Sequence, residues 1–478
     1  MLKGLEISIL NLSEVKDNNE TQRIDSEYFK EEYLDKIREL KSTKHQQLFE
    51  LSSIKGGKRL PLGEEFSLEG IPYIRAQDVK NNFIGFENSP RISEKLHLKL
   101  INYQTKRNDV LITNVGNSIG DTGIVKFNIE KCNLTENAVK IISKKINPDY
   151  LFSFFQSKFG KFQIERETVG TAQPKLAIER IRKFIIPTVN NKFQDKISSI
   201  IKKSYLNKNQ AKQSYNQAET LLLQEIGLQD FTPSKEPVNI KSFADSFAAS
   251  GRLDAEYYQK KYEDVVNTVK NKPFDVLSNL VEIKKSIEPG SKNYVEEGLP
   301  FMRVADLSKN GLSEPQKYIS SHFVKENQNK VNDLKPKKGT ILFSKDGSVG
   351  IAYHLRQDYN GITSGAILHL NVKDESSVIP EYLTLALNSK IVQMQAERDA
   401  GGSIILHWRS SEIENVVVPI IDYKKQQQIA ELIEQSFTLK KQSAHLLEVA
   451  KRAVEIAIEE DEKVALVFIK KETESLPS

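Results

Sequence analysis

The chain has 478 residues and a formal net charge of +5, with 38% hydrophobic residues, 28% charged residues and one cysteine. This length predicts about two to four domains, and the hydrophobic content is sufficient for their cores. The lone Cys132 excludes internal disulfides and cysteine-rich zinc sites, and the apolar runs fall short of the roughly 18 residues that cross a membrane. Because the start also lacks a signal-peptide pattern, we expect a cytoplasmic protein whose slight positive charge permits nucleic-acid binding without establishing it.

Taken in order, the chain repeats itself. Residues 23–29 (RIDSEYF) return as 252–258 (RLDAEYY), and 71–78 (IPYIRAQD) return as 299–306 (LPFMRVAD). The matches keep their order, while their offset drifts only from about 228 to 232 residues. Collinear matches of this kind indicate a duplication in which loops have diverged and elements have persisted. Further matched pairs are 109–120 with 339–350, 148–151 with 380–383, 166–170 with 398–402, and 185–187 with 417–419.

Each half is predicted to contain the same elements: a helix, a mixed segment, a second helix, a short turn, a strand and a long helix. Asp25 and Asp254 are the expected N-caps of the first helices. Short β-branched runs followed by glycine predict buried strands. This order indicates an α/β or α+β domain of about 165 residues in each half. The expected helices are 27–40, 150–162, 256–269 and 381–396, and the expected strands are 72–74, 110–113, 185–187, 300–304, 340–343 and 417–419.

The two long helices, 192–226 and 425–458, contain no internal proline or glycine. Positions spaced alternately four and three share one helix face, and over four repeats this spacing is typical of a coiled-coil seam. Equal lengths and matched polar positions favour two antiparallel helices packed against each other as a rod, over two surface helices that each cover their own domain. Polar seam residues fix register at some cost in stability. The predicted seam residues are Ile197, Ile201, Ser204, Lys208, Tyr215, Leu222, Ile429, Ile433, Ser436, Lys440, Leu447 and Val454.

Two segments after the long helices remain. Residues 464–469 (VALVFI) predict a strand, which we expect to take the place that 238–243 takes after the first long helix, closing the two halves into a ring. The joint at 227–237 contains Gly227, Pro233 and Pro237, which indicate a helix stop and an ordered turn.

The ordered motifs resemble the specificity subunit of type I restriction–modification systems. The first copy has 170–176 (GTAQPKL), then Ile181, 185–187 (IIP) and Phe193-Gln194 at the start of a long helix. The 71–75 box (IPYIR) with Asp78 also fits. The second copy repeats these motifs at 402–404, 413, 418–419 and 426–428, but 404–409 (IILHWR) departs from the pattern. The resemblance covers about residues 20 to 460.

The resemblance implies two target-recognition domains on helical spacers, no catalytic activity, and double-stranded DNA as the ligand. It further implies assembly with two methyltransferase subunits and possibly with restriction subunits, so that S-adenosylmethionine, ATP and Mg would be bound by those partners. The expected divisions are target-recognition domains at 1–186 and 229–418, spacer helices at 187–228 and 419–462, and a C-terminal strand and tail at 463–478. Because two domains on a rod suit a two-part target, each domain is expected to read one half of an asymmetric site.

Candidate DNA contacts are loop residues that can pair with base edges or phosphates. Any one of them could instead be a solvated turn residue. Arg75 and Arg303 each precede an aspartate by three residues, so a structural Arg–Asp pair is equally consistent; residues shared by both halves are also poor candidates for reading different half-sites. The candidates are Lys55, Lys58, Arg59, Arg75, Asn114, Asn117, Ser118, Thr171, Gln173, Lys175, Lys284, Lys285, Arg303, Lys345, Ser348, Ser403, His407 and Arg409.

No catalytic or metal site is predicted. Residues 147–150 (NPDY) depart from the adenine-methyltransferase motif at their third position and read as a helix start with Pro at N1. The histidines show no paired metal spacing. Two other functions remain open from the residues: a coiled-coil scaffold that binds only proteins, and a stand-alone DNA-modifying enzyme. A salt-dependent gel shift separates the scaffold from a DNA-binding protein.

Overall fold

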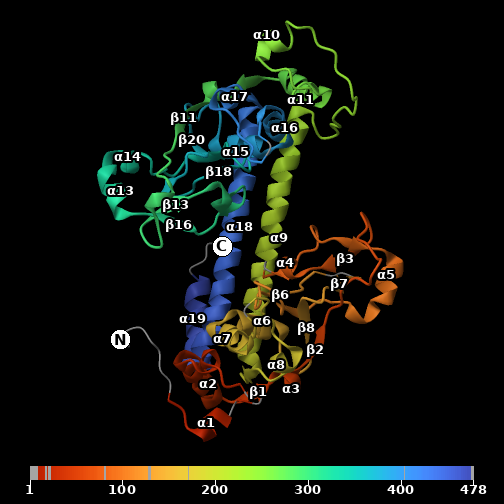
Figure 1. Cartoon of the computed structure of the whole chain (residues 1–478), viewed down its shortest axis with the longest axis vertical. Coiled ribbons are helices and arrows are strands. Elements are labelled where there is room, and N and C mark those ends of the chain that lie inside the picture. The colour runs from red at the N-terminus through yellow and green to blue at the C-terminus, as the bar shows by residue number, and fades with distance from the viewer. Residues whose placement is uncertain are drawn as a thin grey trace. The chain divides into compact units, whose positions relative to one another are not determined.

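The computed structural model describes residues 9–16, 19, 23–79, 82–127, 131–170, 172–402 and 404–474. The chain divides into two compact units, which we call unit 1 (1–209 with 439–478) and unit 2 (210–438). Both long helices, α9 (Asn191–Ile226) and α18 (Tyr423–Glu459), begin in one unit and end in the other (Figure 1). Each domain therefore shares a compact unit with the adjoining parts of both helices.

Unit 1 is built around an antiparallel four-stranded sheet with strand order β2-β8-β5-β6. A smaller sheet, β4-β3-β7, contains a parallel pair between β3 and β7, and β1 pairs with β9. The predicted strands at 72–74, 110–113 and 185–187 are confirmed. The strands are β1 (His45–Gln47), β2 (Ser52–Gly56), β3 (Ile71–Ile74), β4 (Arg91–Ile92), β5 (Val110–Thr113), β6 (Thr122–Ile124), β7 (Asn133–Leu134), β8 (Ala138–Ser143) and β9 (Ile185–Pro187).

Two predicted helices of unit 1 are each broken in two. Lys30 has extended backbone and separates two short helices, with Asp25 capping the first by accepting from the Tyr28 amide. Ser157 ends α6 and caps α7, where its hydroxyl accepts from the Gly160 amide. The helices are α1 (Leu12–Lys16), η1 (Ser26–Phe29), α2 (Glu31–Ser42), α3 (Leu48–Leu51), α4 (Ala76–Val79), α5 (Glu94–Lys99), η2 (Ile101–Tyr103), α6 (Pro148–Gln156), α7 (Lys158–Glu167), α8 (Ile178–Arg182) and α19 (Glu462–Glu474).

Unit 2 repeats this plan. Its main sheet has the order β11-β20-β17-β18, a second sheet has the order β12-β16-β13-β19, and β10 pairs with β21. The predicted strands at 300–304 and 340–343 are confirmed with shifted ends. The strands are β10 (Phe274–Val276), β11 (Val281–Lys285), β12 (Tyr294–Val295), β13 (Leu299–Met302), β14 (Leu307–Ser308), β15 (Gly311–Leu312), β16 (Lys317–Ile319), β17 (Ile341–Ser344), β18 (Ala352–His354), β19 (Ile362–Thr363), β20 (Ile367–Val372) and β21 (Val417–Pro419).

The short helix predicted at 256–269 in unit 2 starts later than expected. It begins at Lys260 after Gln259, so Asp254 is not its N-cap; that carboxylate instead binds Arg252 (2.6 Å). The helix predicted at 381–396 is broken at Ser389. The helices are α10 (Phe247–Ser250), α11 (Lys260–Lys270), α12 (Leu277–Leu280), η3 (Ser291–Asn293), η4 (Val304–Asp306), α13 (Ser321–Glu326), α14 (Gln328–Asp333), α15 (Pro380–Asn388), α16 (Lys390–Asp399) and α17 (Ser410–Glu414).

The antiparallel pairing of α9 and α18 is confirmed within each unit. In unit 1 the Ser204 hydroxyl donates to the Ser443 carbonyl (2.8 Å), and the Ser443 hydroxyl donates to the Ser204 carbonyl (2.8 Å). In unit 2 the Ser436 hydroxyl donates to the Ala211 carbonyl (2.7 Å). Lys208, Lys440 and Leu447 are half-buried at the edge of the seam. The other predicted seam residues are buried: Ile197, Ile201, Ser204, Tyr215, Leu222, Ile429, Ile433, Ser436 and Val454.

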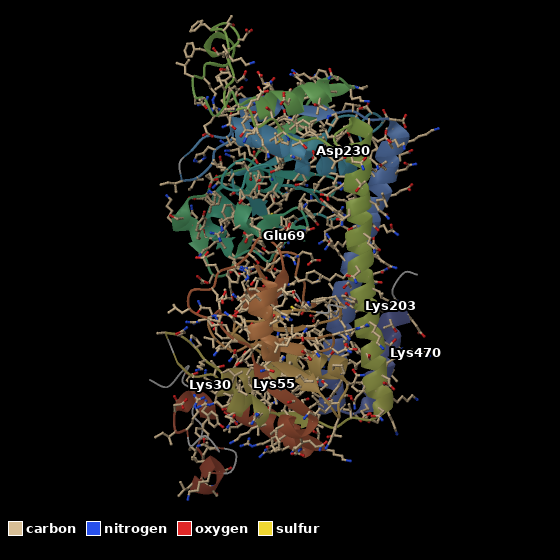
Figure 2. The ribbon with its side chains drawn as sticks, turned by 90° about the vertical axis from the view of Figure 1, so that its right-hand side faces the viewer. Lys30, Lys55, Glu69, Lys203, Asp230 and Lys470 are labelled. Atoms are coloured by element: carbon tan, nitrogen blue, oxygen red, sulfur yellow. The ribbon has the colours of Figure 1, made fainter. Side chains whose placement is uncertain are left out.

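The predicted C-terminal strand is wrong. Residues 464–469 lie in α19, where Ala465 and Ile469 are buried one helical turn apart and the Glu472 carboxylate lies 3.6 Å from His445 on α18. Because α19 buries this apolar face against α18, the run needs no strand partner. Residues 238–243 form no strand either. The described residues therefore lack the two matching strands that were expected to close the halves into a ring. Figure 2 shows Lys470 on α19 and Lys203 on α9.

Candidate nucleic-acid interface

In unit 1, two loops that are far apart in sequence meet at the end of β5. The backbone of Lys175 pairs with Val169 and with Val115, and the Gly116 amide donates to the Pro174 carbonyl (3.0 Å). Gly116 and Gly170 have φ of +96° and +95°, which a side chain would strain. We call 114–118 together with 172–175 the two-loop surface of unit 1.

Unit 2 builds the same frame from different residues. His407 pairs with Gly401 and with Asp346, and the Gly347 amide donates to the Leu406 carbonyl (2.8 Å). Gly347 and Gly402 again have positive φ. The two-loop surface of unit 2 comprises 345–348 and 404–409. Since backbone bonds hold both frames, the side chains at their tips can differ without changing the fold.

Several predicted contact residues are exposed on these surfaces. Asn117, Gln173 and Lys175 are exposed in unit 1, and Ser348 and Arg409 are exposed in unit 2. Amide and cationic side chains of this kind pair with base edges or with phosphates. Thr171 and Ser403, also predicted here, lie outside the described residues.

A wide groove of about 520 Å³ adjoins the unit 1 surface. Arg59, Arg75 and Ser118, all predicted from sequence, line it together with Gln77 and Asn137. Arg59 is 79% exposed and donates from Nε to Glu136 (2.7 Å), which raises the pKa of the guanidinium further and keeps it charged. The structure therefore brings predicted residues from three separate segments to one concave surface.

Burial removes some candidates. Asn114 is 6% exposed, and its amide faces the Leu176 carbonyl (3.4 Å), so it supports the two-loop frame and cannot reach a base edge in this conformation. In unit 2, Asp346 binds both the Lys345 ammonium (2.5 Å) and the His407 ring (2.9 Å). Asp346 therefore pairs with the Lys345 charge and occupies one ring nitrogen of His407 within the protein.

The lysines predicted near the first strand of each domain differ in their surroundings. Lys55, labelled in Figure 2, lies on β2, and with Lys58 and Lys285 it is exposed. Lys284 instead donates to the Asp333 carboxylate (2.6 Å). We therefore retain Lys55, Lys58 and Lys285 as candidate phosphate contacts and discount Lys284.

The matched arginines hold strand ends. Arg75 Nε lies 3.3 Å from Asp78, and its terminal nitrogen donates to the Asn88 carbonyl (3.2 Å). The Arg303 amide donates to Asp306 (2.9 Å), while Arg303 Nε is buried without a hydrogen-bond partner among the described residues. The Arg–Asp pair of the first copy is therefore present, and it leaves Arg75 half-buried at the groove.

Sequence reasoning missed Gln77 and Asn137. Their matched positions in the second copy are Ala305 and Gly365, so both differ between the halves. Residues that read different half-sites should differ in this way, and that signal was available in the aligned repeats. Gln77 is exposed on α4.

One group of three potential metal ligands occurs among the described residues, although the histidine spacing gave no sign of it. His354, Glu381 and Glu434 have ligand atoms within 4.8 Å of one another. However, Arg356 already binds Glu434 (2.7 Å) and lies 3.4 Å from the Phe437 ring centroid. A cation in that position opposes a metal ion, so we assign the group to the packing of β18 and α15 on α18.

The fold and these surfaces define a protein with two similar domains that present divergent polar loops on a common frame. The family model described as "Type I restriction modification DNA specificity domain" matches residues 37–220 and 272–449. The chain belongs to this family and carries its domain twice. It is thus a sequence-specificity subunit for DNA of a type I restriction–modification system.

The chain is also similar to solved structures at low identity. A type I restriction–modification S subunit from M. genitalium is 14% identical, with 91% of this chain and 96% of that chain covered and a TM-score of 0.41. The HsdS subunit from Thermoanaerobacter tengcongensis is 15% identical, with 87% and 97% covered and a TM-score of 0.28. A search of curated proteins gave no significant match. Among the described residues, no helix is both long and apolar enough to cross a membrane.

Proposed function

We propose that each unit reads one half of a bipartite, asymmetric DNA site. The observation that carries this proposal is the repeated two-loop surface, whose backbone frame is the same in both units while the exposed side chains differ. On this frame Lys175 of unit 1 occupies the position of His407 in unit 2, and Gln173 occupies the position of Ile405. Different side chains on one frame favour different base sequences at the two half-sites.

In unit 1, the groove beside the two-loop surface extends the proposed contact. Arg59 and Lys58 are exposed and cationic and suit phosphates, whereas Gln77 and Asn137 carry amides that can pair with adenine edges. Thr171, Ser403 and Arg303 remain proposed contacts on sequence grounds alone.

The proposed protein partners are two methyltransferase subunits, with restriction subunits where cleavage occurs. We propose that they dock on the outer faces of α9 and α18 and on the bases of the domains. On α9, Lys202, Lys203 and Leu206 form part of an exposed stripe, and Leu206 is 57% exposed. An exposed leucine among polar residues of a helix suits a protein contact.

We further propose that this chain performs no catalysis, that its partners bind S-adenosylmethionine, ATP and Mg, and that the complex acts in the cytoplasm, where the DNA is. The family is defined by DNA specificity, which agrees with a division of labour between reading and chemistry. Purified chain with S-adenosylmethionine should leave duplex DNA unmethylated, and adding methyltransferase subunits should restore transfer.

A domain exchange tests the reading proposal. Replacing residues 44–187 by the equivalent domain of a related subunit should change one half of the methylated sequence, as read by methylome sequencing of the host, and leave the other half unchanged. A change in both halves, or in neither, would refute the assignment of one half-site to each unit. Gel shifts at increasing salt should show the negative slope that phosphate contacts require, whereas a protein-binding scaffold would give none.

A further inference from the structure

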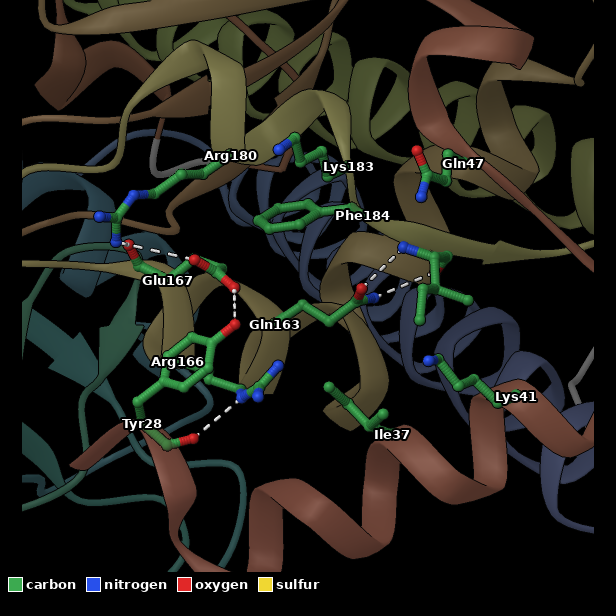
Figure 3. A pocket seen from close by; sticks show the side chains of 11 residues that line it. Tyr28, Ile37, Lys41, Gln47, Gln163, Arg166, Glu167, Arg180, Lys183 and Phe184 are labelled. Carbon is green, nitrogen blue, oxygen red and sulfur yellow. Dashed lines mark hydrogen bonds and ion pairs between the residues drawn. The ribbon is translucent and has the colours of Figure 1, made fainter. Parts of the chain in front are cut away.

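A cavity of about 160 Å³ lies in unit 1 among η1, α2, α7 and α8 (Figure 3). None of the residues proposed to contact DNA lines it. Four of its side chains are cations, and one is a carboxylate: Lys41, Arg166, Arg180 and Lys183 against Glu167. Lys41 and Lys183 are exposed, while Arg166 is only 5% exposed. The cavity therefore has a cationic interior and a cationic rim.

The Arg166 guanidinium is held in place but not neutralised. Its Nε donates to the Tyr28 carbonyl (2.9 Å), and its Cζ lies 3.7 Å from the centroid of the Tyr28 ring. Its two terminal nitrogens donate no hydrogen bond to any described residue, and Figure 3 shows the guanidinium directed into the cavity. Burial lowers the pKa of Arg166, so the charged form is not fully compensated.

The nearby carboxylate is engaged elsewhere. Glu167 Oε1 accepts from the Tyr28 hydroxyl (3.0 Å), and Oε2 lies 3.6 Å from an Arg180 terminal nitrogen. Arg180 is itself fixed, because it also donates to the Glu167 carbonyl (2.8 Å). The Glu167 carboxylate is thus engaged by Tyr28 and Arg180, and it accepts no hydrogen bond from the terminal nitrogens of Arg166.

In the second copy, the arginine that matches Arg166 binds a carboxylate of the protein itself. Arg398 matches Arg166, and Asp399 binds it through two oxygens (Nε–Oδ1 2.6 Å and Nη2–Oδ2 3.1 Å). Despite burial, this carboxylate raises the pKa of Arg398 above its usual value. Glu412 and Asn415 stand where the first copy has Arg180 and Lys183. The second copy therefore supplies its own oxyanion. At the four matched positions the formal net charge is +2 in the first copy and −1 in the second, a difference of three.

We propose that the cavity of unit 1 is a binding site for a single oxyanion group, a carboxylate or a phosphate. The ligand would accept hydrogen bonds from both terminal nitrogens of Arg166, because Nε is engaged by the Tyr28 carbonyl, whereas Asp399 accepts from Nε and one terminal nitrogen of Arg398. Lys41 and Lys183 would attract it at the rim. Paired donors on a planar guanidinium match the oxygens of either group. The cavity has room for a group of this size, since a water molecule takes up about 30 Å³ of liquid. This site is independent of the DNA-reading surfaces.

The test uses the full chain with two probes, inorganic phosphate observed by ³¹P NMR and trifluoroacetate observed by ¹⁹F NMR, at constant ionic strength. Both signals should broaden with the wild-type chain, and each probe should displace the other from one site. The stronger competitor identifies whether the site prefers phosphate or carboxylate chemistry.

Variants that introduce the residues of the second copy into the cavity test whether the probes bind there. Glu167→Asp with Arg180→Glu and Lys183→Asn should raise the dissociation constant of both probes at least about tenfold, because the Arg166 guanidinium then receives an internal carboxylate. Lys95→Glu with Lys106→Asn makes the same change in net charge at exposed positions outside the cavity and should leave binding unchanged. Equal binding by the cavity variant and wild type would overturn the proposal, as would equal loss in both variants.

A milder variant guards against misfolding. Lys183→Asn alone changes an exposed residue and should weaken probe binding about threefold to tenfold with unchanged thermal unfolding; unaltered binding would count against the site. A gel shift with duplex DNA on the same variant keeps the two proposals apart. Retained DNA binding with weakened probe binding is the expected pattern.

Discussion

The recognition domain of unit 1 contains a buried ion pair that a serine of the long helix α9 also contacts. Lys126 and Asp149 have side chains that are 5% and 2% exposed, and they form an ion pair. Ser198 on α9 donates to the same carboxylate (2.7 Å). Replacing Asp149 by alanine would leave the Lys126 ammonium buried, with the Asn108 side-chain oxygen (3.2 Å) as its remaining hydrogen-bond partner among the described residues.

The expected decrease in the free energy of unfolding arises because the buried Lys126 ammonium loses its carboxylate partner. Breaking a buried pair by removing one partner typically costs about 3–5 kcal/mol. For a unit of this size each kcal/mol lowers Tm by about 2–4 °C, so Asp149→Ala should lower the melting temperature of unit 1 by about 6–20 °C. The double replacement Lys126→Met with Asp149→Leu removes both charges and should cost less than the single change.

The measurement must separate the two units, because the full chain need not unfold in one step. Hydrogen exchange with mass spectrometry on peptides of α6 and β6, combined with thermal unfolding, would localise the effect. Asp35→Ala is the matched control: Asp35 pairs with Arg38 at the surface (2.7 Å), and its loss should cost no more than about 1 kcal/mol. If Asp149→Ala cost no more than Asp35→Ala, the reasoning from burial would be refuted.

Further predictions concern the reading surface, the seam and acid stability. Gln173→Ala should cost about 1–3 kcal/mol of discrimination at one base pair of one half-site, measured by competition gel shifts, whereas Lys175→Ala should weaken all sequences alike and reduce the salt slope by about one; the reverse pattern would exchange their roles. Ser204→Leu should cost about 1–3 kcal/mol in urea unfolding, because the seam position is fully buried and leaves no room; an unchanged midpoint would contradict this packing. Burial, aided by Arg356, lowers the pKa of His354 from 6.5 to about 4, so the stability it contributes is complete above pH 6.5 and is lost as pH falls toward about 4. His354→Gln should flatten that part of the pH profile of urea unfolding, and an unchanged profile would exclude His354 as its source.

Periodicity predicted the long helices well because burial repeats along them. Residues such as Ile197 and Leu222 are buried at the expected spacing, and Ser204 and Ser436 occupy matched buried positions. Breaks inside shorter helices were not visible, since Lys30 and Ser157 differ from helical neighbours in backbone angle rather than in polarity. The run at 464–469 misled because β-branched residues are common to strands and to buried helix faces.

The candidate contact residues also include some that are exposed, as predicted, and some that are buried. Residue type and loop position singled out Asn117, Gln173 and Lys175, which are exposed, but also Asn114, which is buried behind them. Sequence does not reveal which side of a turn a side chain faces. It also could not show that Asp346 contacts two of the predicted residues, Lys345 and His407, because that carboxylate meets His407 only through the fold.

The duplication, the paired spacer helices and the family follow from residue order, because each is a pattern repeated along the chain. Which loops meet, and whether a carboxylate binds Arg166 as Asp399 binds Arg398, depend on contacts that arise only when the chain folds. Matched sequence positions can be equal while their neighbours in space differ, and the electrostatic state of a side chain depends on those neighbours.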